Sequence, residues 1–71
     1  MPPVPRLSAR QVERILRAHG FTLARSSGSH EQWTDAARHR VTLPRHGSRT
    51  LSVQTMASII RQSGLPTESF K

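Results

Sequence analysis

Two apolar stripes at helical spacing, one near each end of the chain, most strongly limit the folds open to this sequence. The first stripe repeats at offsets i, i+3, i+4 and i+7 and consists of Val12, Ile15, Leu16 and His19. Ser8 and Gln11 have the spacing of a capping box, and Gly20 stands where a left-handed residue ends a helix. The pattern predicts a helix from Ser8 to about His19.

The second stripe predicts a helix in the last third of the chain. It consists of Met56, Ile59 and Ile60. Ser52 is a suitable N-cap, Gly64 a suitable C-terminal residue, and Pro66 prevents simple continuation.

The segment between the two helices reads as three short strands, at residues 21–25, 30–34 and 38–43. The run 26–29 is a tight connection, and Pro44 ends or borders the third strand. Short connections favour packing of sequential neighbours, so we expect an α+β fold in the order α-β-β-β-α. Three antiparallel strands would carry both helices on one face. The residues expected on the open face are His30, Gln32, Thr34, Arg40 and Thr42.

The size and composition predict one small domain over residues 1–71, with a Pro-rich, flexible leader at residues 1–6. Only 34% of the residues are apolar and there is a single tryptophan, so the core is expected to be a thin two-layer one of modest stability. The chain has no cysteine and its N-terminal run has no apolar signal-peptide region, which predicts a cytoplasmic protein without a membrane span.

The net charge of +7, carried mostly by arginine, favours a polyanionic or acidic partner. Arg10, Arg14 and Arg17 lie opposite the apolar face of the first helix, where solvation is the simplest interpretation. Charge alone does not separate nucleic acid from an acidic protein.

Four blocks of residues, in order, resemble the HicA toxins of bacterial toxin–antitoxin pairs. They are Leu16 with Gly20-Phe21; Gly28-Ser29-His30 with Trp33; Val41 to His46; and Thr55-Met56 leading to Ser58 to Gly64. The chain departs from the pattern at Gln54, where a glycine is common. The resemblance implies a double-stranded-RNA-binding-domain-like fold, an endoribonuclease that cleaves mRNA and inhibits translation, His30 as its catalytic residue, and a HicB-type antitoxin that covers the active surface.

The residues themselves are compatible with metal-independent RNA cleavage. RNA supplies its own nucleophile in the 2′-hydroxyl, and an imidazole can take or give a proton near neutral pH. We expect His30 to be the base or acid. The residues expected to contact RNA are Gly28, Ser29, Arg25, Arg40, Arg45 and His46, of which the arginines would hold phosphate and His46 could be a second proton carrier. No cofactor is expected.

Simpler interpretations stay open for several of these residues. Trp33 could stack on a base, but with so few aromatic residues it is at least as well explained as a core anchor. The histidines lack the helical i, i+4 spacing of a zinc motif, so no metal site is expected. Two other function classes remain: a non-catalytic RNA-binding module of the same fold, and an interaction protein whose basic face binds an acidic partner.

Overall fold

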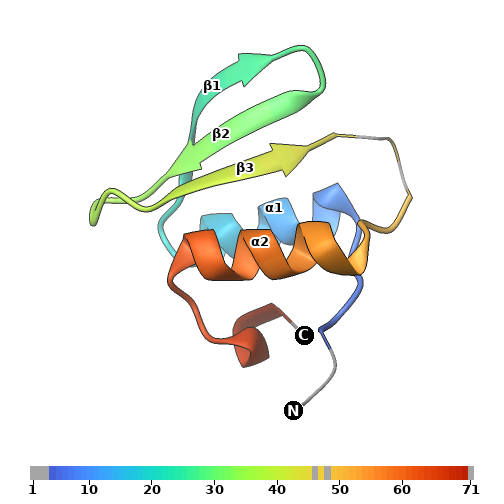
Figure 1. Ribbon diagram of the computed structural model, residues 1–71. Coiled ribbons are helices and arrows are strands. Elements are labelled where there is room, and N and C mark those ends of the chain that lie inside the picture. Colours follow the sequence, from blue (N-terminus) through green and yellow to red (C-terminus); the bar gives the residue numbers. More distant parts are fainter. Residues whose placement is uncertain (1–3, 46, 48, 71) are drawn as a thin grey trace.

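The chain folds into a three-stranded antiparallel sheet with two helices packed on one face (Figure 1). The computed structural model describes residues 4–45, 47 and 49–70. The elements in order are α1 (Ala9–Ala18), β1 (Thr22–Ser27), β2 (His30–Thr34), β3 (Arg40–Pro44), α2 (Val53–Ser63) and a short 3-10 helix, η1 (Thr67–Phe70). The sheet order is β1-β2-β3. The α+β, double-stranded-RNA-binding-domain-like architecture predicted from the sequence is confirmed.

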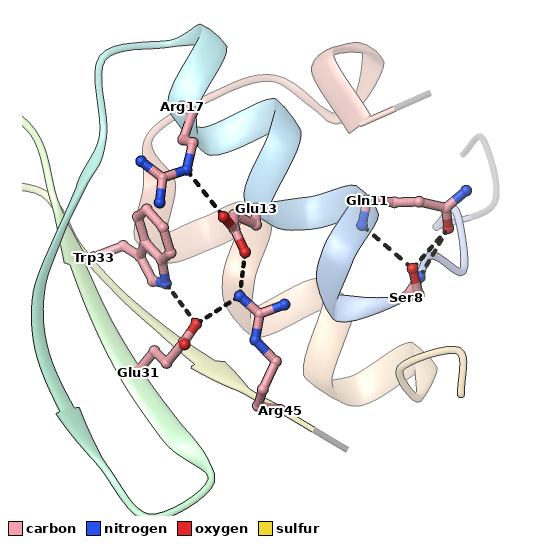
Figure 2. A network of polar contacts seen from close by, with 7 residues as sticks. All are labelled: Ser8, Gln11, Glu13, Arg17, Glu31, Trp33 and Arg45. Carbon is pink, nitrogen blue, oxygen red and sulfur yellow. Dashed lines mark hydrogen bonds and ion pairs between the residues drawn. The ribbon is translucent and has the colours of Figure 1, made fainter. Parts of the chain in front are cut away.

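The start of α1 is fixed by the predicted capping box. The Gln11 backbone N–H donates to Ser8 Oγ at 3.2 Å, and the Ser8 backbone N–H donates to Gln11 Oε1 at 2.9 Å (Figure 2). The helix ends before Gly20, whose φ of 86° only glycine adopts freely. The two bonds of the capping box satisfy two backbone N–H groups that would otherwise have no partner at the start of the helix.

The ends of α2 also follow the sequence signals. Ser52 Oγ accepts the Thr55 backbone N–H at 3.1 Å, and Gly64 at the C-terminus has a φ of 72°. The helix buries Met56 and Ile59, as its apolar stripe predicts.

β2 has the predicted bounds, whereas the ends of β1 and β3 differ from the predicted ones by one or two residues. At the β2–β3 turn, Arg38 adopts a φ of 69° and the His39 backbone N–H donates to Asp35 Oδ1 at 2.8 Å. This side-chain bond extends the turn to residue 39, so β3 begins at Arg40 instead of Arg38. Pro44 is the last residue of β3, which is an edge strand. Because proline has no backbone N–H to donate to a neighbouring strand, it is confined to such edge positions.

The core lies between the sheet and the helices. Trp33 is its largest member and is 1% exposed, which confirms its interpretation as a core anchor. Phe70 is fully buried. It belongs to η1, an element that no sequence signal predicted. Residues 1–3 of the expected leader lie outside the described residues, while Val4 packs against the core.

Candidate functional site

His30 is the first residue of β2 and follows a two-residue hairpin loop, Gly28-Ser29. The loop joins Ser27 to His30, which are paired across β1 and β2. Gly28 has a φ of 58°, and an added Cβ would meet nothing within 4 Å, so the position needs glycine for backbone conformation and not for space. The tight loop fixes the register that places His30 at this end of the sheet.

Strand alternation puts His30 on the face that the helices leave open. On β2, Glu31 and the buried Trp33 lie on the helix-covered side, so His30 and Gln32 lie on the other. His30 is exposed to solvent. The predicted open face is therefore present, and His30 belongs to it.

A β-bulge brings Arg25 onto the same face. Leu23 pairs with Trp33 but Arg25 pairs with Gln32, so Ala24 is an extra residue in β1. Under strict alternation Arg25 would share the face of Leu23, on the helix-covered side. The bulge reverses this and turns Arg25 toward the side of the sheet that carries His30.

Together these residues form a surface depression of about 370 Å³, here called the His30 hollow. Its lining consists of Ala24, Arg25, Ser27, His30, Gln32 and Arg40. Two guanidinium groups and one imidazole belong to this lining, which includes no carboxylate among the described residues. Such an arrangement concentrates anions beside a group that can exchange protons.

Gly28 and Ser29 lie in the loop beside this hollow without lining it. The Ser29 carbonyl accepts the backbone N–H of Arg45 at 2.6 Å, which ties the loop to the end of β3. In the structure, Gly28 and Ser29 thus set the hairpin that leads into His30.

Arg45 is not brought together with His30. Its guanidinium lies on the helix-covered side, where it contacts the carboxylates of Glu13 and of Glu31, the latter at 3.0 Å (Figure 2). Glu31 also accepts the Trp33 indole N–H at 3.2 Å. Hydrogen bonds from Arg45 and then from Arg17 hold the pKa of Glu13 below its usual value, and the same contact with Glu13 raises the pKa of Arg45. The last predicted contact, His46, lies outside the described residues.

Gln32 is a member of the hollow that the sequence placed on the open face without assigning it a role. Its Oε1 accepts the Thr42 hydroxyl at 3.2 Å, while the Thr42 backbone N–H donates to Gln62 of α2 at 3.1 Å. Alternation along β2 was the signal for its position. These bonds hold the amide side chain across β2 and β3, beside His30.

Among the described residues, no three His, Asp or Glu side chains gather closely enough to hold a metal ion. Within the same residues no helix has the length and apolar character needed to cross a membrane.

The fold and the open face define a class: a small α+β protein of the double-stranded-RNA-binding-domain type with one histidine in a basic hollow. Comparison with protein families narrows this class to one family. A family model described as the HicA toxin of bacterial toxin–antitoxin pairs matches residues 9–65, from the first residue of α1 to just beyond α2. The chain belongs to the HicA toxin family. It is the toxin of a toxin–antitoxin pair, and its partner is an antitoxin. A search of curated proteins found no match.

Proposed function

We propose that this toxin is a metal-independent endoribonuclease that cleaves mRNA in the cytoplasm and thereby inhibits translation, with His30 as its catalytic residue. The observation that carries the proposal is the His30 hollow, where an exposed imidazole lies with Arg25 and Arg40 on the open sheet face. Family membership supports the same activity.

The reaction needs little beyond what the hollow contains. The 2′-oxygen of RNA attacks the adjacent phosphorus, the bond from phosphorus to the 5′-oxygen breaks, and the products are a cyclic phosphate and a 5′-hydroxyl. His30 either removes the 2′-hydroxyl proton or donates a proton to the departing 5′-oxygen. Arg25 and Arg40 stabilise the negative charge that develops on the phosphate oxygens.

The decisive experiment incubates labelled single-stranded mRNA with purified protein in the presence of a metal chelator. The His30→Ala variant is compared with His19→Ala, in which an exposed histidine at the end of α1 is removed instead. We expect cleavage with a 5′-hydroxyl end by the unmodified protein and by His19→Ala, and a loss on the order of 100-fold or more for His30→Ala, the size of a general acid–base contribution.

Other outcomes assign a different function. Binding of RNA by all three proteins without cleavage would identify a non-catalytic RNA-binding module. Equal cleavage by the His30→Ala variant would exclude His30 as the catalyst. Circular dichroism of each variant verifies that the fold is retained.

We further propose that a HicB-type antitoxin with an acidic surface covers the His30 hollow. Its carboxylates would bind Arg25 and Arg40, so the complex would not admit RNA. Replacing both arginines with glutamine should weaken the complex and make it less sensitive to salt, while Arg61→Gln, an exposed change on α2, should not. Equal effects of the two changes would place the antitoxin elsewhere.

A further inference from the structure

A second and larger depression lies on the helix-covered side of the molecule, along α1. Its volume is about 690 Å³, and we call it the α1 hollow. Among the described residues, its lining includes one carboxylate, that of Glu13, and four arginines: Arg10, Arg14, Arg17 and Arg45. It is therefore also basic.

The arginines of this hollow differ in how they are held. Arg45 and Arg17 both bind Glu13, and the Arg17 guanidinium lies 4.8 Å from the ring centre of Trp33 (Figure 2). Arg10 and Arg14 form no ion pair with any described carboxylate. They are separated by about one turn of α1, roughly 6 Å along its axis. The hydrogen-bond donors of Arg10 and Arg14 thus have no described acidic partner, whereas the neighbouring Arg17 and Arg45 are both paired with Glu13.

The two hollows share no lining residue, but residues of both lie at one end of the sheet. His30 pairs with Pro44 across β2 and β3, and the next residue, Arg45, already belongs to the α1 hollow. The hydrogen bond from the Arg45 backbone to Ser29 closes this end. A polymer bound at His30 that continues across Pro44 would therefore reach Arg45, and with it the α1 hollow, at the end of β3.

We propose that the α1 hollow binds the phosphodiester backbone of the same RNA strand that is cleaved at His30, with Arg10 and Arg14 as its phosphate ligands. This proposal rests on the proposed function, since the polymer is its substrate. An extended polyanion accounts for two basic hollows on either side of the end of β3, because one strand can pass over Pro44 from His30 to the α1 hollow. Separate acidic protein contacts would not require the two hollows to lie this close together. Guanidinium groups suit the role because they bind phosphate oxygens bidentately.

The test measures binding in the His30→Ala protein, so that cleavage does not interfere. Single-stranded RNAs of about 4 and about 16 nucleotides, the span of site sizes seen for small single-strand-binding folds, are titrated over a range of salt concentrations. Arg10→Gln/Arg14→Gln is compared with Arg38→Gln/Arg61→Gln, which removes two charges at the opposite end of β3 and on α2. Glutamine is a good helix former, so α1 is preserved.

For the longer RNA, we expect the slope of log affinity against log salt to shrink by about 0.7 for each arginine lost from α1, and much less for the control pair. For the short RNA, which fills only the His30 hollow, the two variants should behave alike. Equal losses for both variants with the longer RNA would overturn the proposal, as would unchanged binding of the longer RNA by Arg10→Gln/Arg14→Gln. Because only binding is measured, these results stand apart from the cleavage assay: a protein that never cleaves can still confirm or refute the α1 hollow.

Discussion

At the scale of single residues, the His39 side chain connects two parts of the chain that are distant in sequence, Asp35 in the β2–β3 turn and Gly64 at the end of α2. His39 Nδ1 lies 2.8 Å from Asp35 Oδ2, which holds the pKa of Asp35 below its usual value. The other side of the ring lies against Gly64, where an added Cβ would come within 2.6 Å of Nε2. The His39 side chain is 43% exposed and joins the β2–β3 turn to the end of α2.

This contact predicts that Gly64→Ala destabilises the protein more than Gly20→Ala. Both positions have positive φ, which costs an alanine roughly 1–2 kcal/mol. Only Gly64 adds a clash, since nothing lies within 4 Å of a Cβ at Gly20. The free energy of unfolding, measured by urea denaturation, checks the difference. Adding His39→Ala should remove most of the excess cost at Gly64, and no recovery would show that the ring is not its cause.

At the scale of elements, Glu13 is the polar connection between α1 and the sheet. Its carboxylate binds Arg17 on its own helix and Arg45 after β3, and Arg45 continues the network to Glu31 of β2 (Figure 2). The Glu13 and Glu31 side chains are 25% and 15% exposed, so water only partly screens these pairs. The network therefore helps to orient α1 against the strands that carry the His30 hollow on their other face.

We expect Glu13→Gln to destabilise the protein by about 1 kcal/mol at pH 7, the upper range for partly exposed pairs. The pKa of Glu13 is lowered in the folded protein, so its contribution is complete above the ordinary value of 4.5 and is lost as the pH falls through the lower folded pKa. Unfolding free energies measured from neutral to acid pH should thus converge for the two proteins. Glu68→Gln, in η1, serves as the control. A difference that persists unchanged in acid would contradict an ionic origin.

At the scale of the whole molecule, a small core carries two basic surfaces on opposite sides of one sheet. The Cα radius of gyration is 11.1 Å, and the buried apolar side chains of the described residues form one cluster. A domain of this size leaves much of its surface exposed and has modest stability. Anionic partners that bind only the folded chain should therefore change its stability appreciably.

Single-stranded RNA should accordingly raise the melting temperature of the His30→Ala protein. At an RNA concentration of 100 times Kd, the gain is about 2.7 kcal/mol, or roughly 10 to 20 °C for a domain of this size. Differential scanning fluorimetry measures the shift, with Arg25→Gln/Arg40→Gln as the comparison. We expect that variant to show a smaller shift at the same RNA concentration. An identical shift would mean that RNA does not use the His30 hollow.

The sequence by itself determined the two α-helices, the three strands and their order, though not η1. Helix caps, apolar stripes and turn residues act over a few positions, so Ser8, Gln11, Ser52 and Gly64 could be assigned from local spacing alone. Alternation along β2 likewise placed His30 on the sheet face opposite to that of Trp33.

Strand alternation had already placed Arg40 on the face of His30, but only the tertiary structure decided that Arg25 joins them and that Arg45 does not. A bulge at Ala24 shifts Arg25 to the open face, and a bulge depends on pairing with a neighbouring strand, which period-two spacing does not encode. Arg45 is drawn to the other side by Glu13, 32 residues earlier in the chain, because long-range charge pairing competes with any local preference. The α1 hollow arises in the same way, from residues of α1 and of the chain after β3 that become neighbours only when the helix packs beneath the sheet.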